Sequence, residues 1–172
     1  MTEIRFLGRE QTLERLEELS EVLSDCVHGG ASVSFMLPFA MEEARDYWRG
    51  IADAAGEGDT LLAVALHDSR VAGTVQVGMK QTSNQPHRGD LKKLLVHRAA
   101  RGLGLSRLLM EAAERKAAEG GKTLLVLDTA TGSPAEAIYP RFGWTRVGVV
   151  PDYALYPDGS FCGTTFFYKR IA

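Results

Sequence analysis

The sequence has little of three features that mark particular protein classes: cysteine, net charge and long apolar runs. Its two cysteines, Cys26 and Cys162, stand far apart and without the spacing of metal ligands. We therefore expect reduced thiols in a reducing compartment and no metal site. The formal net charge of −2 leaves room only for a local basic patch around Arg98, Arg101 and Arg107. A nucleic-acid partner or an anionic membrane partner is accordingly not expected.

Long apolar segments are also absent. The first residues lack the apolar core of a signal peptide, and no stretch reaches the ~18 apolar residues of a membrane-spanning helix. These absences predict a cytoplasmic protein. Hydrophobic residues make up 45% of the 172 and charged residues 24%, which is ordinary for a globular chain. Because repeats, low-complexity segments and linkers are missing, we expect one domain over residues 1–172, and a homodimer is left open.

The apolar periodicity predicts a mixture of helices and strands. Apolar residues recur at helical spacing in a first segment that ends before Gly29 and Gly30, and again over residues 42–55. A further helix should follow residues 101–107, and a short one should begin at Ser133. Extended runs are expected at residues 4–7, 60–66, 71–79, 90–96, 123–127, 146–150 and 164–168.

A glycine-containing turn between the strand at 90–96 and the next helix is the most informative segment. It reads Arg101-Gly102-Leu103-Gly104-Leu105-Ser106-Arg107. Small residues ahead of a helix let backbone N–H groups approach an anion, and the helix N-terminus adds unpaired donors and partial positive charge. A Walker loop is excluded because no Gly-Lys-Ser/Thr follows. The fingerprint of a dinucleotide-binding turn does not match either, because its third glycine is missing from this sequence. The alternative to an anion site is that these glycines only form an ordinary turn between the strand and the helix.

The same run resembles the signature Arg/Gln-x-x-Gly-x-Gly/Ala of the GNAT superfamily of N-acetyltransferases. Ser106 departs from the usual small apolar residue at the last position but is itself small. The resemblance continues through residues 90–96, 124–128 and 137–144. It implies an α/β fold with a mixed, mostly antiparallel sheet of six or seven strands flanked by helices. Strands 90–96 and 124–128 would run parallel and splay apart to admit a cofactor.

Under this resemblance the acyl donor is acetyl-CoA, held largely by backbone groups. Its pyrophosphate would lie on the amides of the turn, and its pantetheine arm would lie beside the preceding strand, whose backbone would polarise the thioester carbonyl. The implied cofactor-binding residues are Leu94, Leu95, Val96, Arg101, Gly102, Leu103, Gly104, Leu105, Ser106 and Arg107.

Acetyl transfer to an amine needs a proton acceptor, because an alkyl ammonium is mostly protonated at neutral pH. Asp90 and Asp128 are the candidates, since each lies at the end of a core strand and the resemblance supports both. Either carboxylate could instead bind the ammonium while water removes the proton. A structural role is the other alternative, with Asp128 capping residues 128–132 and Asp90 paired with Lys92 or Lys93.

Tyr139 is the candidate proton donor for the departing thiolate. Its segment resembles the superfamily pattern Ala-x-x-x-Tyr-x-x-x-Gly-Phe, matched here by Ala135, Tyr139, Gly143 and Trp144. A thiol with a pKa of ~8.5 leaves readily, so a phenol with a pKa of ~10 assists rather than being indispensable. The alternative is a structural tyrosine whose ring is buried in the core and whose hydroxyl is exposed to solvent.

The acceptor is expected to be a small primary amine that attacks acetyl-CoA directly in a ternary complex. Neither Cys26 nor Cys162 has an identifiable histidine partner that would favour an acyl-enzyme. The resemblance assigns the acceptor pocket to residues 29–39 and 152–158. The tail from residue 150 onward looks like that of tabtoxin-resistance acetyltransferases, which implies an amino-acid-like acceptor. A protein or peptide N-acetyltransferase and a non-catalytic acyl-CoA sensor are the alternatives.

Overall fold

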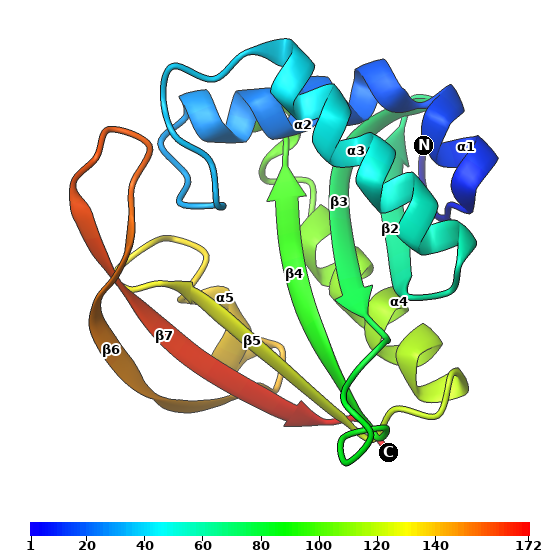
Figure 1. The fold of residues 1–172 in the computed structure, drawn as a ribbon, viewed down its shortest axis with the longest axis vertical. Helices are drawn as coiled ribbons and strands as arrows, with labels where there is room; N and C mark the ends of the chain where they lie inside the picture. The colour runs from blue at the N-terminus through cyan, green and yellow to red at the C-terminus, as the bar shows by residue number, and fades with distance from the viewer.

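A single sheet runs through the computed structural model, which describes residues 1–172 (Figure 1). Its seven strands are β1 Thr2–Phe6, β2 Thr60–His67, β3 Arg70–Gly78, β4 Arg88–Val96, β5 Leu124–Ala130, β6 Thr145–Leu155 and β7 Phe161–Arg170. In space they follow the order β1-β2-β3-β4-β5-β7-β6. Every neighbouring pair is antiparallel except β4 and β5, which run parallel. The expected mixed, mostly antiparallel sheet is confirmed.

Strands β4 and β5 form a V. They pair over three positions, ending at Asp90 opposite Val126, and then diverge. Beyond that point β4 stays paired with β3, and β5 stays paired with β7. Gly89 permits the close approach at the vertex, because an added Cβ would lie 2.9 Å from Leu125 Cδ2 and 3.0 Å from Val77 Cγ1. The splayed parallel pair that the sequence predicted is therefore present.

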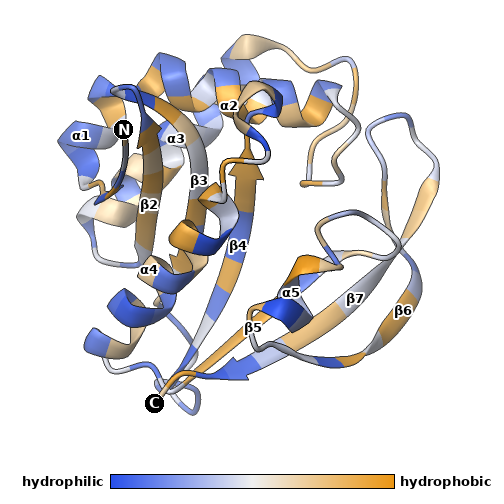
Figure 2. Cartoon of the chain, turned by 180° about the vertical axis from the view of Figure 1, so that it is seen from behind, coloured by the Kyte–Doolittle hydropathy of each residue, from blue (hydrophilic) through white to orange (hydrophobic).

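Helices cover both faces of the sheet. They are α1 Arg9–Glu14, α2 Leu16–His28, α3 Met41–Gly56, α4 Leu105–Glu119 and α5 Ile138–Arg141, with a short 3₁₀ turn, η1, at Arg98–Ala100. Helices α2 and α3 lie in front of the sheet in Figure 1, whereas α4 and α5 lie on the face seen in Figure 2. None of these helices has both the length and the apolarity needed to cross a membrane.

Each helical layer closes its own apolar core against the sheet. Under α2 and α3, the side chains of Leu19 and Trp48 are completely buried. On the α4 face, Leu109 of α4 and Phe167 of β7 are buried to the same degree. Burial of apolar surface stabilises by roughly 25 cal/mol per Å², so the packing of helices on both faces holds the V in shape.

Three element boundaries differ from the sequence expectation. The first helical segment is two helices, because the chain breaks at Arg15, whose φ of −101° and ψ of 14° are not helical. The short helix starts at Ile138 rather than at Ser133, whose hydroxyl accepts a 3.4 Å hydrogen bond from the Glu136 amide. Strand β6 is longer than residues 146–150 because it is an edge strand, which tolerates Pro151 and a register shift.

Candidate active site

The glycine-containing turn joins β4 to α4 and is not part of a helix. Gly102 and Gly104 have φ values of 83° and 74°, which L side chains rarely adopt, and α4 begins directly after Gly104. A Cβ added to either glycine would meet nothing within 4 Å, so the space beside this backbone is open. No side chain caps the N-terminus of α4, so the amides of its first turn have no side-chain hydrogen-bond partner. This geometry fits an anion cradle.

The three arginines around the turn are engaged differently. The amide and Nε of Arg98 donate to Asp25 at 2.8 Å and 2.9 Å, which anchors η1 to the end of α2. Arg107 lies 4.8 Å from the Phe142 ring centroid and 3.6 Å from Glu111. Arg101 is exposed and forms no salt bridge, and its side chain is hydrogen-bonded to the uncharged thiol of Cys26, so its charge is not neutralised by a carboxylate.

Leu94, Leu95 and Val96 form the last part of β4, beyond the vertex of the V. Their outer edge has no strand partner on the β5 side, because the parallel pairing stops at Asp90. Free N–H and C=O groups on a strand edge can pair with an extended ligand. The predicted cofactor segment is therefore continuous in space, from this edge through the turn to the start of α4.

Asp128 lies inside β5 rather than in the loop after it. Its carboxylate accepts a 2.8 Å hydrogen bond from the Thr164 hydroxyl of the neighbouring strand. The alternative role as a cap on residues 128–132 is wrong, since the Gly132 amide donates to Glu136 instead. Asp128 remains exposed and borders a cavity on the α2–α3 side of the V.

Asp90 shares that face of the sheet but sits deeper, at the vertex. Its register partner Val126 is two residues before Asp128, so all three side chains project from the same face. The Asp90 carboxylate pairs with Arg88 and accepts a 2.9 Å hydrogen bond from Gln81 Nε2. The alternative, a structural pairing with Lys92 or Lys93, is wrong, because Arg88 and Gln81 occupy the carboxylate.

Tyr139 lies within α5 and is 5% exposed. Its ring packs 5.5 Å from that of Phe167 and 6.3 Å from that of Trp144, measured between centroids. Burial raises the pKa of Tyr139 to about 12, opposed by a hydrogen bond with the side chain of Thr129. The phenol therefore stays protonated at neutral pH and lies next to the strand that carries Asp128. The ring lies in the core, as the structural alternative requires. The hydroxyl, however, is hydrogen-bonded to Thr129 rather than exposed to water.

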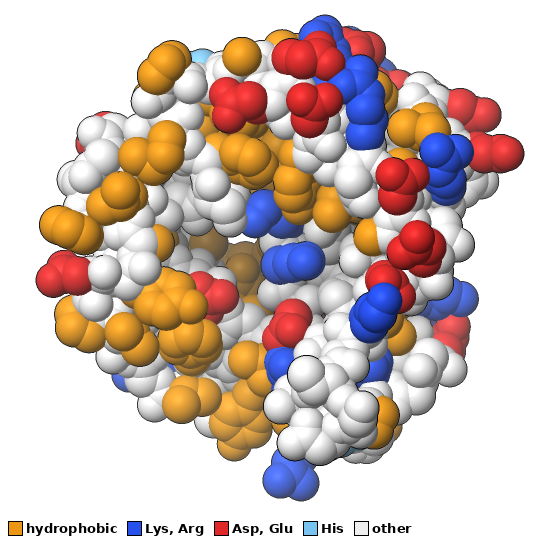
Figure 3. All heavy atoms as spheres, viewed as in Figure 1, with side chains coloured by type: hydrophobic (Ala, Val, Ile, Leu, Met, Phe, Trp, Pro, Cys, Tyr) orange, Lys and Arg blue, Asp and Glu red, His pale blue; other side chains and the backbone are white.

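A cavity of about 340 Å³ lies beside Asp128. It is lined by Ser32, Ser34, Met36, Asp128, Thr129, Ala130, Tyr153, Ala154, Leu155, Cys162 and Thr164. The loop after α2 and the β6–β7 hairpin meet here, since the Ser32 hydroxyl donates to the Leu155 carbonyl at 2.9 Å and the Leu37 amide to the Pro157 carbonyl at 3.0 Å. The two segments expected to form the acceptor pocket are thus in contact. Figure 3 shows a deep hollow at the centre of this face.

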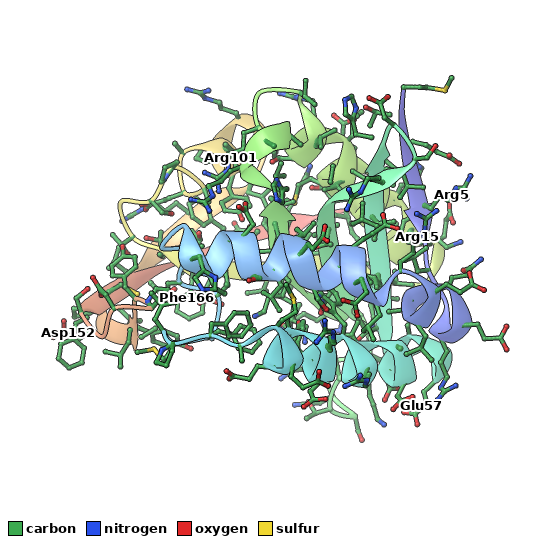
Figure 4. The ribbon with its side chains drawn as sticks, turned by 90° about the horizontal axis from the view of Figure 1, so that it is seen from above. Arg5, Arg15, Glu57, Arg101, Asp152 and Phe166 are labelled. Atoms are coloured by element: carbon green, nitrogen blue, oxygen red, sulfur yellow. The ribbon has the colours of Figure 1, made fainter.

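A larger hollow of about 730 Å³ lies at the corner between α1 and α3. It is lined by Gly8, Arg9, Glu10, Gln11, Asp53, Gly56 and Glu57, with no apolar side chain. In Figure 4, Glu57 and Arg101 lie at opposite ends of the molecule. The smaller cavity is the better candidate site, because no residue of the cradle, β4 or β5 lines the larger hollow.

Residues 18–144 match the acetyltransferase (GNAT) family. The chain belongs to this family. Acetyl-CoA-dependent acetyl transfer is general to GNAT acetyltransferases, so the family activity explains the anion cradle at the start of α4.

Solved GNAT structures superpose over nearly the whole chain. An N-acetyltransferase from Staphylococcus aureus Mu50 has a TM-score of 0.81 at 17% identity, covering 100% of this chain and 99% of that one. A phosphinothricin acetyltransferase from Sinorhizobium meliloti, in complex with acetyl-CoA, has a TM-score of 0.79 at 15% identity, covering 98% and 88%. A ribosomal-protein-alanine N-acetyltransferase from Brucella melitensis has a TM-score of 0.81 at 19% identity, covering 98% and 99%. These likenesses show the GNAT fold.

Sequence reasoning missed Lys93, which lies at a register irregularity of β4. Its φ is 54°, and its carbonyl accepts a 3.0 Å hydrogen bond from the Thr74 hydroxyl. Its ammonium donates to the Ser34 hydroxyl at 3.0 Å and lies 5.8 Å from the Tyr47 ring centroid. Burial, followed by repulsion from Lys92, lowers the pKa of Lys93 to about 8. The available signal was two successive lysines inside an otherwise apolar strand.

Proposed function

We propose that the protein is an N-acetyltransferase, comprising one domain, that transfers an acetyl group from acetyl-CoA to a primary amine of a small, amino-acid-like molecule. The observation that carries the proposal is the position of Asp128 and Tyr139. Asp128 lies on the β5 arm of the V and borders the cavity of about 340 Å³, the side chain of Tyr139 is hydrogen-bonded to Thr129, the next residue of that strand, and the anion cradle follows the β4 arm. An acyl donor and an amine approaching from these two sides would meet beside both groups.

The cradle and the free edge of β4 fit acetyl-CoA. Gly102 and Gly104 leave room for a phosphate close to the backbone amides, and Arg101 can add a formal positive charge. The edge formed by residues 94–96 offers N–H and C=O groups to the amides of a pantetheine arm. A backbone N–H on this edge would also polarise the thioester carbonyl.

Asp128 is the better candidate for accepting the proton of the amine. It borders the cavity, whereas Asp90 lies at the vertex and is occupied by Arg88 and Gln81. Asp128 takes the proton directly or through water as the amine nitrogen attacks the carbonyl carbon. Asp90 then lies at a greater distance from the amine, and its charge is offset by that of Arg88.

Tyr139 stabilises the leaving thiolate as a hydrogen-bond donor. Full proton transfer from a phenol with a pKa of about 12 to a thiolate whose acid has a pKa of ~8.5 is unfavourable. A hydrogen bond to the developing negative charge on sulfur needs no such transfer. The thiolate then takes its proton from solvent.

Direct attack in a ternary complex is favoured over an acyl-enzyme. Burial raises the pKa of the Cys26 thiol, which disfavours the thiolate that a nucleophile requires. Cys162 borders the cavity, but its Sγ lies 3.4 Å from the Ser32 hydroxyl, with no histidine base beside it. The cradle at Arg101 and the β6 hairpin at Asp152 lie on different sides of the molecule in Figure 4, which suits two substrates arriving separately.

A thiol-release assay with acetyl-CoA and a panel of amino acids, aminoglycosides, polyamines and peptides tests the proposal. Turnover of small amines would support it and would dispose of a non-catalytic acyl-CoA sensor. Turnover of peptides alone would favour a protein or peptide N-acetyltransferase. The hydrogen bonds from Ser32 to Leu155 and from Leu37 to Pro157 favour a small acceptor, because they join the loop after α2 to the β6–β7 hairpin across the cavity.

A further inference from the structure

We propose that Lys93 selects acceptors that carry an anionic group, such as a carboxylate, close to the amine that is acetylated. This inference rests on the proposed function and adds to it a residue that determines acceptor specificity. It starts from a cation without a carboxylate partner: the Lys93 ammonium forms no salt bridge, and its hydrogen bond goes to the neutral Ser34 hydroxyl.

The cation and Asp128 lie on the two arms of the V. Lys93 projects from β4 and Asp128 from β5, and the two are near enough for Asp128 to act on the charge of Lys93 without forming a salt bridge with it. Ser34, the hydrogen-bond partner of Lys93, lines the same cavity as Asp128. Basic and acidic side chains both border the hollow seen in Figure 3.

A separated pair of opposite charges fits a zwitterion in one orientation. An ammonium would lie at Asp128, where the proposed reaction takes place, and a carboxylate would lie at Lys93. The hydroxyls of Ser32, Ser34 and Thr164 supply neutral hydrogen-bond partners in between. The reverse orientation would bring like charges together at both ends and would place the amine away from the cradle.

The surroundings hold the Lys93 ammonium in place. Its side chain extends over the ring of Tyr47, whose hydroxyl pairs with the completely buried Gln76 at 2.9 Å. The Thr74 hydroxyl fixes the backbone at the irregular position of β4. A partly buried charge interacts more strongly than one in bulk water, so a bound carboxylate gains more here than at a surface lysine.

Free amino acids and their methyl esters test this role, because the ester lacks the negative charge. In thiol-release assays, wild-type protein should favour the free acids by at least ~10-fold in kcat/KM, as expected for one charge-assisted hydrogen bond. Lys93→Gln should lower this ratio by at least ~10-fold by raising KM for the acids, with the esters little changed. Esterification also lowers the basicity of the amine, so the diagnostic quantity is the change in ratio between variants.

Two further variants separate charge from structure. Lys93→Arg keeps the cation and should keep most of the preference. Lys92→Gln changes the exposed neighbour on the same strand and should leave the ratio at the wild-type value. If Lys93→Gln instead lowered kcat/KM equally for acids and esters, together with thermal stability, Lys93 would be a structural residue and the proposal would be overturned.

The same assays distinguish failure of the Lys93 proposal from failure of the proposed function. Turnover of free acids and esters with the same acid-to-ester ratio in wild type and in Lys93→Gln would overturn the role of Lys93 but keep the acetyltransferase. Absence of thiol release with every amine would count against the proposed function. In that case, calorimetric titration of the same amino acids into protein loaded with CoA decides the role of Lys93. Binding that Lys93→Gln abolishes would uphold it, and no binding to wild type would overturn it.

Discussion

At the residue scale, the phenol of Tyr139 can be tested without disturbing its packing. Tyr139→Phe keeps the ring between Trp144 and Phe167 and removes only the hydroxyl. We expect kcat to fall on the order of 10²-fold while acetyl-CoA affinity changes little, because the hydrogen bond to sulfur strengthens only as charge develops. Steady-state kinetics and calorimetry measure the two effects. Tyr168→Phe on β7 is the control, and an equal loss in both variants would contradict this role.

The two carboxylates should differ because one is free and the other is occupied. Asp128→Asn should lower kcat/KM by at least ~10²-fold through loss of the proton acceptor. Asp90→Asn should cost less than ~10-fold, since Arg88 and Gln81 already hold that side chain at the vertex. If Asp128 only holds the ammonium, KM for the amine rises and kcat is unchanged. A larger loss for Asp90→Asn would reverse the assignment.

The charge on Lys93 gives the acceptor preference a pH dependence. The side chain is cationic below its pKa of about 8 and loses the charge as the pH rises through that value. Three titratable groups face it: Lys92 on β4, Tyr47 on α3 and Asp128 on β5. The acid-to-ester ratio in kcat/KM of wild type, divided by the same ratio for Lys93→Gln, should therefore be constant below about pH 7 and fall above about pH 8. The division removes the difference in amine basicity between acids and esters, and a quotient that does not change with pH would contradict this prediction.

At the element scale, the turn between β4 and α4 was predictable because its signal is local. Positive φ at Gly102 and Gly104, and a helix that begins at Leu105, follow from adjacent residues. The environment of Asp90 was not predictable, because Arg88 and Gln81 reach it through the geometry of a strand and a preceding loop. Lys93 was missed because its partner Ser34 lies far away along the chain.

Gly104→Val tests the turn as an element. A β-branched residue in the left-handed region is strained by ~1–2 kcal/mol and projects into the space beside the helix amides. We expect acetyl-CoA affinity to fall at least ~10-fold in a folded protein. Gly50→Ala in α3 is the matched control, because that position also has open space but an ordinary helical φ. Unchanged affinity of Gly104→Val by calorimetry would count against the cradle.

At the scale of the whole molecule, the V divides the sheet into β1–β4 and β5–β7, joined by only three paired positions. The loop after α2 spans the opening, through Ser32 to Leu155 and through Leu37 to Pro157. This arrangement separates the proposed binding of acetyl-CoA from that of the amine. The cradle follows β4 in the first half of the sheet, whereas the cavity is lined by β5, β6 and β7 together with the loop after α2.

Ser32→Ala should consequently weaken acceptor binding alone. The substitution removes the hydrogen bond to the Leu155 carbonyl, which is worth about 1 kcal/mol, and lets the loop move away from β6. We expect KM for the amine to rise ~3–10-fold while acetyl-CoA affinity stays at the wild-type value, the opposite of Gly104→Val. Ser83→Ala, in an exposed loop remote from the cavity lining, controls for loss of a hydroxyl. Equal weakening of both ligands in Ser32→Ala would show that the loop organises the whole V, because the two sites would then be coupled through it.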